Sequence, residues 1–117
     1  MREKAIKALG LFLSRAHDIS DLELRKTWKA LFYCFWHSDK PKVQNELADR
    51  LCALMHKVAP GKAWPFVRAF WHTMVREWTH IDRLRLNKFY VLMRCSVEHS
   101  LQYAAHEEWS LEEVEAF

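Results

Sequence analysis

The chain has 117 residues, half of them apolar, so it can bury one hydrophobic core but is short for two domains. Only two glycines and three prolines occur, which argues against a β-sandwich or a fold with a glycine-rich nucleotide loop and favours helices. The formal net charge is +3, but residues 95–117 contain six carboxylates and no Lys or Arg, so a basic body precedes an acidic end.

The first two predicted helices are marked by apolar spacing and by a capping signal. A helical period of apolar residues predicts a first helix from about Arg2 to Ala16. Ser20 with Glu23 is a capping box that opens a second helix. The apolar stripe of this second helix consists of Leu24, Trp28, Leu31, Phe32 and Phe35. Within ALFYCFW the stripe widens to nearly the whole circumference, so we expect this helix to be buried at the centre of the fold.

A loop separates the third and fourth predicted helices. We expect Ser38 or Asp39 to cap the third helix, with Pro41 in its first turn, and the short connection predicts that it is an antiparallel neighbour of the second. Its predicted inward face is Val43, Leu47, Leu51, Leu54, Met55 and Val58. After the loop APGKAWP, Pro65 is expected to open a fourth helix. The predicted inward residues of the fourth helix are Phe66, Phe70, Trp71, Met74 and Trp78.

The fifth predicted helix runs from about Arg83 to Ala105, with Asp82 as its N-cap. Arg83 and Arg85 would then lie in a first turn, where the helix macrodipole favours carboxylates. We therefore expect an anion beside them, which is a phosphate, a carboxylate of a partner, or an internal acid. The internal candidates are Asp82, Asp39 and Glu77.

Together these elements predict an all-α fold of about five to six helices. A second capping box, Ser110 with Glu113, predicts the start of a sixth helix close to Phe117. Antiparallel helix pairs joined by short loops are typical of a HEAT-like α-solenoid or of a compact helical bundle. We expect residues 1–117 to form a single helical domain that is the amino-terminal portion of a larger helical domain.

No motif of a metal, cofactor or catalytic site is strong in this sequence. Three cysteines, Cys34, Cys52 and Cys95, lie in apolar segments without a CxxC motif, which favours free thiols in a reducing compartment and no metal or cofactor. Signal-peptide, membrane-span, phosphate-loop and HExxH patterns are missing. We expect an intracellular, soluble protein without a small-molecule substrate. A paired-carboxylate nuclease stays open as a distant alternative, with Asp39, Glu46, Asp49, Glu77 and Asp82 as its acids.

Basic residues gather at three places along the chain. Arg25, Lys26 and Lys29 lie on the polar side of the second helix, a pair of lysines at the next junction, and three cations at the start of the fifth helix. A basic surface suits an anionic partner such as RNA, whereas the alternative is an ordinary solvated surface with internal ion pairs. The sequence alone leaves both interpretations open.

Two long segments resemble a known family. LRKTWKALFYCFWHSDKPKVQNELADRL and FVRAFWHTMVREWTHIDRLRLNKFYVLMR are similar to the amino-terminal domain of the eukaryotic ribosomal RNA-processing protein 1 family, the nucleolar Nop52 type. The resemblance implies a HEAT-like scaffold that acts without catalysis in the nucleolus, within the nucleus, during large ribosomal subunit assembly and pre-rRNA processing. Its implied partners are the pre-ribosomal large-subunit particle, ribosomal RNA and other assembly factors.

The resemblance also divides the marked residues into two groups. The predicted rRNA- or partner-binding residues are Arg25, Lys26, Lys29, Lys40, Lys42, Arg76, Arg83, Arg85 and Lys88. The residues expected to be mainly architectural are Trp28, Phe32, Trp36, Asp39, Pro41, Trp71, Trp78 and Asp82. The alternative hypothesis is a purely protein-binding helical repeat module, which an exposed apolar patch containing Trp109, Leu111 or Phe117 would favour.

Overall fold

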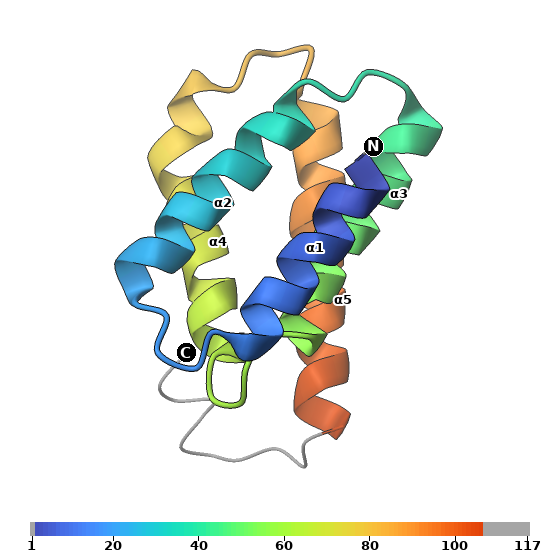
Figure 1. The fold of residues 1–117 in the computed structure, drawn as a ribbon. Coiled ribbons are helices and arrows are strands. Elements are labelled where there is room, and N and C mark those ends of the chain that lie inside the picture. The colour runs from blue at the N-terminus through green and yellow to red at the C-terminus, as the bar shows by residue number, and fades with distance from the viewer. Residues whose placement is uncertain (1, 107–117) are drawn as a thin grey trace.

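A computed structural model of the chain describes residues 2–106, which fold as helices without any strand (Figure 1). The α-helices are α1 (Arg2–Arg15), α2 (Asp21–Trp36), α3 (Pro41–Ala53), α4 (Ala63–Glu77) and α5 (Leu86–His106), and two short 3-10 helices are η1 (Leu54–His56) and η2 (Trp78–His80). The all-α prediction is confirmed. The predicted sixth helix at Ser110 and Glu113 falls outside the described residues. None of the described helices is long and apolar enough to cross a lipid bilayer.

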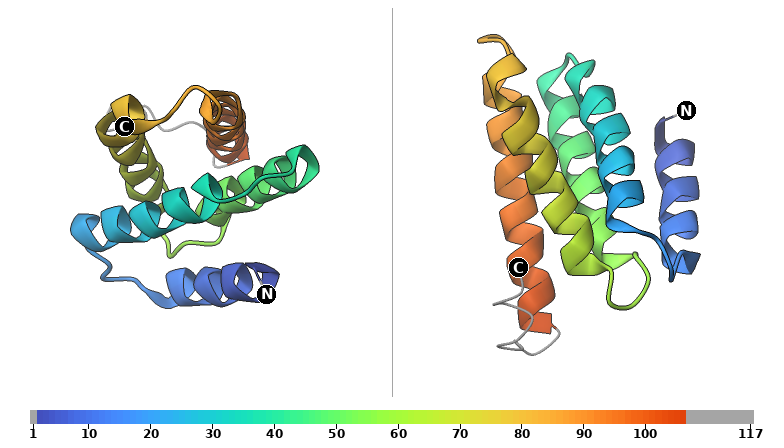
Figure 2. Two further views of the ribbon diagram at one scale, coloured as in Figure 1. Left: turned by 90° about the horizontal axis from the view of Figure 1, so that it is seen from above. Right: turned by 90° about the vertical axis from the view of Figure 1, so that its left-hand side faces the viewer.

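The helices stack as antiparallel hairpins in layers. α2 and α4 run in one direction and α3 and α5 in the other (Figure 1), with α2 packed along α4 and α3 along α5. Seen from above, α1 forms one layer, α2 and α3 the next, and α4 and α5 the last (Figure 2). Equivalent helices of successive hairpins therefore lie side by side, as in an α-solenoid.

Aromatic rings fill the space between the two hairpins. Trp28 meets Phe66 and Phe70 of α4 with ring centroids 5.2 and 4.9 Å apart. Phe89 of α5 stacks on Phe32 at 4.8 Å, and all five side chains are buried. Rings at these separations add specific geometry to the large apolar area they remove from water. The prediction that the second helix lies at the centre of the fold is thus confirmed.

Helix α2 begins where the sequence predicts it, but the expected cap of α3 is wrong. Ser20 Oγ accepts a hydrogen bond from the Glu23 backbone N–H at 3.1 Å. At the other end, Ser38 is buried and its hydroxyl donates to the Phe35 carbonyl at 2.6 Å, so it closes α2 instead of opening α3. Lys40 is the N-cap residue of α3 and makes no side-chain capping bond, whereas Pro41 is the first helical residue as predicted.

Two further predictions about α3 and α4 need correction. Val43 is 37% exposed, because it lies in the first turn of α3, and a helix end borders solvent on more sides than its middle. α4 begins at Ala63, before Pro65. Proline fits there because the first turn of a helix has no partner for its backbone N–H groups. The preceding loop turns at Gly61, whose φ of +81° favours glycine.

The start of α5 also differs from the prediction. Residues Asp82 to Arg85 form a turn in which the Arg85 N–H donates to the Asp82 carbonyl at 3.0 Å, and the helix itself begins at Leu86. The Arg85 carbonyl accepts the first helical bond, from the Phe89 N–H at 3.3 Å. Asp82 is therefore not an N-cap. Arg83 and Arg85 precede the helix, so they do not oppose the macrodipole from inside its first turn.

Candidate nucleic-acid interface

A basic groove lies between α2 and α4, which we call the α2–α4 groove. It has a volume of about 270 Å³ and is lined by Leu22, Arg25, Lys26, Lys29, His72, Thr73, Arg76 and Glu77. The α2 residues recur at the spacing of one helical face, and so do the α4 residues. Because α2 packs along α4, the structure brings together four of the predicted binding residues from two segments that are far apart in the sequence.

The four cations of this groove are exposed and form no salt bridge with a described residue, although Glu77 also lines the groove. Arg25, Lys26, Lys29 and Arg76 are exposed, and none forms a salt bridge with a residue in the described range. Four cations beside one carboxylate leave an excess of positive charge, which attracts anions. The groove therefore has the electrostatics of a polyanion-binding surface.

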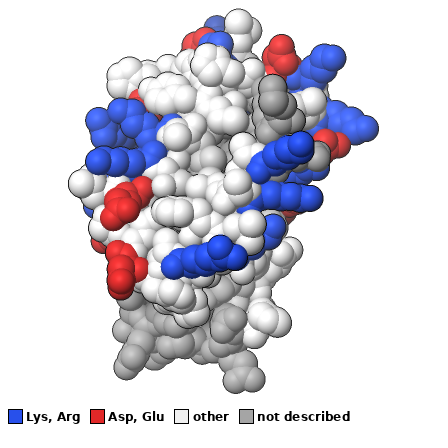
Figure 3. Space-filling view, in the orientation of Figure 1, with Lys and Arg blue, Asp and Glu red and all other residues white. Residues whose placement is uncertain are grey.

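Basic side chains are unevenly distributed over the face of the molecule that carries α1 (Figure 3). On the face that carries α1, basic side chains gather beside α2 at one edge and along α1 and α3 at the other (Figure 3). The acidic side chains on this face are fewer, and the area between the two edges is mostly uncharged (Figure 3). The basic surface is thus divided into separate regions.

A second predicted region lies at one end of the stack, where the α2–α3 and α4–α5 connections are found (Figure 1). Lys40, Lys42 and Arg83 are exposed there. Arg85, in contrast, makes two side-chain contacts. Its guanidinium forms an ion pair with the Asp82 carboxylate at 2.5 Å and lies 4.6 Å from the centroid of the Trp36 ring. The internal ion pair considered from the sequence is therefore present for Arg85, with Asp82 as its acid.

Lys88 does not belong to either exposed region. Its side chain is buried, and Nζ donates to the carbonyl oxygens of Trp36 at 2.5 Å and Ser38 at 2.6 Å. The Trp36 carbonyl ends α2 and the Ser38 carbonyl lies two residues beyond it, so neither has a partner within the helix and a cation there is structural. We therefore do not retain Lys88 among the surface residues available to a ligand.

The residues expected to be architectural have three kinds of environment. Trp28 and Phe32 are buried in the core, Pro41 opens α3, and Asp39 is exposed and caps no helix. Trp71 and Trp78 pack against the core as predicted, but they are only half-buried. Both line a hollow of about 350 Å³ with Met74, Val75, Tyr90 and Met93, between α4 and α5.

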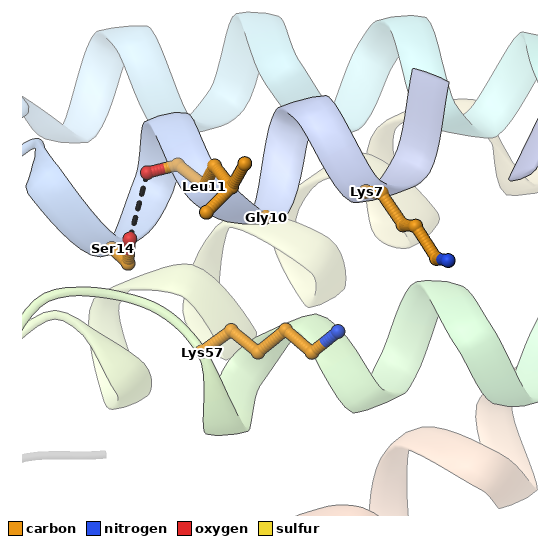
Figure 4. A pocket seen from close by; sticks show the side chains of 5 residues that line it. All are labelled: Lys7, Gly10, Leu11, Ser14 and Lys57. Atoms are coloured by element: carbon orange, nitrogen blue, oxygen red, sulfur yellow. Dashed lines mark hydrogen bonds between the residues drawn. The ribbon is translucent and has the colours of Figure 1, made fainter. Parts of the chain in front are cut away.

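A further groove was missed by the sequence analysis. It lies between α1 and η1, has a volume of about 510 Å³, and is lined by Lys7, Gly10, Leu11, Ser14 and Lys57 (Figure 4). Gly10 permits the close approach, since a Cβ there would lie 3.3 Å from Lys57 Cδ. The two lysines are separated by fifty residues in sequence, and no local pattern connects them.

The structure also links histidines and an aspartate that the sequence analysis did not connect to each other. His56 Nε2 lies 3.0 Å from His99 Nδ1, and His99 Nε2 lies 2.8 Å from Asp49 Oδ1. Nearby, burial raises the pKa of the Cys52 thiol and, less strongly, that of Cys95, so neither is an activated nucleophile. In residues 2–106 no three His, Cys, Asp or Glu side chains converge as metal ligands would.

The chain is similar to proteins of a known family. The profile described as "Nucleolar protein, Nop52" matches residues 1–117. The chain is 41% identical to human ribosomal RNA processing protein 1 homolog A over 97% of its own length and 26% of the relative. It is 47% identical to the mouse homolog A over 80% of the chain and 19% of the relative, and 34% identical to the Drosophila melanogaster homolog over 81% and 14%.

These matches show the family of the chain and how much of each relative the chain covers. The chain spans about a quarter or less of the length of these curated relatives. The family profile, in contrast, covers the chain from end to end. The resemblance inferred from the two long segments is therefore confirmed, and the chain belongs to the Nop52 family of nucleolar proteins.

Proposed function

We propose that the chain is a non-catalytic helical scaffold of large ribosomal subunit biogenesis, which acts in the nucleolus during pre-rRNA processing. It binds pre-ribosomal particles through ribosomal RNA and other assembly factors. The observation that supports this most directly is the α2–α4 groove, where four cations lie without an internal salt bridge among the described residues. The names of the relatives, which are ribosomal RNA processing proteins, support the same assignment.

Phosphate contacts explain how such a surface works without bond-making chemistry. Each Lys or Arg that neutralises a phosphate releases condensed counterions, so binding is strong at low salt and weakens as the salt concentration rises. The rigid helix pair holds the cations in a fixed arrangement, and Lys40, Lys42 and Arg83 extend the basic surface at one end of the stack. The scaffold thereby holds an rRNA segment in position for neighbouring factors.

The experiment compares two triple charge reversals in the full chain. Arg25→Glu, Lys29→Glu and Arg76→Glu change the α2–α4 groove, whereas Lys4→Glu, Lys7→Glu and Lys57→Glu make the same change in net charge elsewhere. Binding to a transcript of large-subunit precursor rRNA is measured against salt concentration. For single-stranded RNA, loss of three phosphate contacts lowers the magnitude of the slope of log K against log salt by roughly 2.

We expect the groove variant to bind RNA more weakly and to show a shallower slope of log K against log salt. The control should keep most of its affinity and most of its slope. In cells, the tagged groove variant should also associate less with pre-large-subunit particles than the control does. Equal losses in both variants would show that net charge alone determines binding. Salt-insensitive binding of the unaltered protein would contradict the proposal.

The α4–α5 hollow favours a second function, that of a purely protein-binding helical module. Val75 is 78% exposed and Tyr90 50% exposed, and both line this apolar hollow with the half-buried tryptophans. Apolar surface of this kind often marks contacts with other proteins. The patch considered from the sequence, Trp109, Leu111 and Phe117, falls outside the described residues. Recovery of protein partners without rRNA in the cellular experiment would favour this alternative.

A further inference from the structure

Among the described residues that line the α2–α4 groove, Glu77 is the single carboxylate. It is only 8% exposed. Its contacts among the described residues are long, with the Tyr33 hydroxyl donating to Oε1 at 3.4 Å and His80 Nδ1 3.5 Å from Oε2. No Lys or Arg in this range lies within 4.0 Å of it as a salt-bridge partner.

The described residues supply only weak donors to this carboxylate, so most of its acceptor capacity is available to solvent or to a ligand. An ionised carboxylate offers about four lone-pair sites, and hydrogen bonds near 3.4 Å are at the weak limit of the distance range. Burial of a charge with few partners is unfavourable. A ligand that brings N–H donors into the groove would therefore be stabilised at this position.

The surrounding cations restrict what that ligand can be. Arg25, Lys26, Lys29 and Arg76 attract anionic groups, whereas Glu77 repels them. The ligand must therefore present anionic groups to the exposed cations and N–H donors to Glu77. The ionised side chains of an acidic peptide would bind the cations but offer Glu77 no donor, and a basic peptide is repelled by the four cations. A nucleic-acid strand combines phosphates with donors on its bases.

The base edges available in RNA narrow the choice further. Duplex RNA uses its Watson–Crick edges internally, so only unpaired bases can present them to a protein. Guanine has adjacent N1–H and N2–H₂ donors that match the two oxygens of a carboxylate. Uracil has one N–H between two carbonyl oxygens, which a carboxylate repels. Leu22 of α2 and His72 of α4, on opposite walls of the groove, offer an apolar surface and a ring against which a base can stack.

We propose that the α2–α4 groove binds single-stranded RNA and recognises an unpaired guanine through Glu77. This inference rests on the proposed function, because the rim cations provide the phosphate contacts. Glu77 then determines base specificity, while Arg25, Lys29 and Arg76 determine affinity. The volume of about 270 Å³ is many times the ~30 Å³ share of one water, so the groove offers space of the size a base needs.

The test uses the full chain and fluorescein-labelled oligonucleotides of about ten nucleotides, within the usual site sizes for single strands. One is a run of uridines, a second has a central guanosine pair, and a third has inosine in place of each guanosine. Inosine lacks the 2-amino group, so it removes one donor without any change to the protein. Fluorescence anisotropy gives the affinity of each strand.

We expect the guanosine strand to bind roughly fivefold or more tightly than the uridine strand, since a bidentate base contact discriminates by about 1–3 kcal/mol. Inosine should remove part of this preference. Glu77→Gln should abolish it while binding of the uridine strand is unchanged or stronger, because a negative charge is lost. Glu46→Gln, an exposed carboxylate of α3 outside the groove, is the matched control and should retain the preference.

The outcomes separate the two proposals. Equal affinity of the unaltered protein for all three strands, or a guanosine preference that survives Glu77→Gln, overturns recognition by Glu77 but leaves phosphate binding intact. Equal binding of inosine and guanosine strands would likewise contradict it. Stronger binding to an acidic peptide than to any strand would overturn it in favour of a protein ligand. Failure of every RNA to bind would reject the proposed function itself.

Discussion

Lys88 joins the end of one helix to the side of another. From α5 its Nζ donates to two carbonyls, those of Trp36 and Ser38, at 2.5 and 2.6 Å, and it lies 5.7 Å from the centroid of the Phe35 ring. These carbonyls lie at the C-terminus of α2 and just beyond it, where the macrodipole places negative partial charge. A single ammonium group therefore satisfies two backbone acceptors and complements the helix end.

We predict that Lys88→Met destabilises the protein. Methionine keeps much of the apolar stem but leaves the Trp36 carbonyl without its donor and the Ser38 carbonyl with Gln44 Nε2 alone, at 3.1 Å. An unpaired acceptor of this kind costs about 1–3 kcal/mol in the free energy of unfolding. Urea denaturation followed by circular dichroism measures this change. Lys42→Met, an exposed lysine of α3, is the control and should stay within about 0.5 kcal/mol of the unaltered protein. Equal stability of the two variants would contradict the structural role.

At the scale of elements, a chain of side chains connects α3 and η1 to α5. Asp49 of α3 accepts from His99 of α5, which in turn contacts His56 of η1. With both histidines neutral, His56 Nε2–H can donate to His99 Nδ1 while His99 Nε2–H donates to Asp49, and this tautomer is inferred from the network. Burial lowers the pKa of His56, and the neighbouring His99 and His106 lower it further. The folded protein therefore favours neutral His56.

We predict that stability decreases as the pH falls below about 6.5, the unperturbed pKa of histidine. Since the pKa of His56 is lower in the folded state, the unfolded chain binds a proton first, and the contribution of His56 is lost as the pH falls through the folded value. Urea midpoints at pH 7.5, 6.5 and 5.5 measure the decline. His56→Gln should flatten it, whereas His17→Gln, an exposed residue of the α1–α2 connection, should not. An identical decline in both variants would refute the prediction.

At the scale of the whole molecule, α1 is an integral layer of the stack. Leu13 is 1% exposed, and its carbonyl accepts a hydrogen bond from the Ala59 N–H at 3.0 Å. Gly10 is buried against the Lys57 side chain. The first helix and the loop before α4 are thereby fixed together, so α1 covers the outer side of the first hairpin (Figure 2).

We predict that Leu13→Ala lowers the free energy of unfolding by about 2–5 kcal/mol, because a buried leucine is replaced by a cavity. Leu11→Ala on the same helix is the control, since Leu11 is 59% exposed and its loss should cost less than about 0.5 kcal/mol. Urea denaturation should show one transition for each variant. A loosely attached α1 would instead give two variants of equal stability.

Several parts of the fold can be read from short stretches of sequence. Ser20 with Glu23 predicts the start of α2, and the period of Phe66, Phe70 and Met74 predicts the buried face of α4, because capping and helical spacing depend on residues close in the chain. Helix ends at connections are less predictable. Asp82 looks like a cap, yet its carboxylate pairs with Arg85, since a short polar side chain has several local partners to choose from.

The sequence alone therefore determined the helical class, the order of the helices, and the presence of many cations, since composition and local periodicity encode them. Which cations meet was decided by tertiary structure. Arg25 and Arg76 line one groove because α2 packs along α4, whereas Lys88 is buried because α5 brings it against the end of α2. These side chains come from distant parts of the chain, and their charges look alike in sequence. Only the packing of one helix against another separates a cation that faces solvent from one that binds a carbonyl.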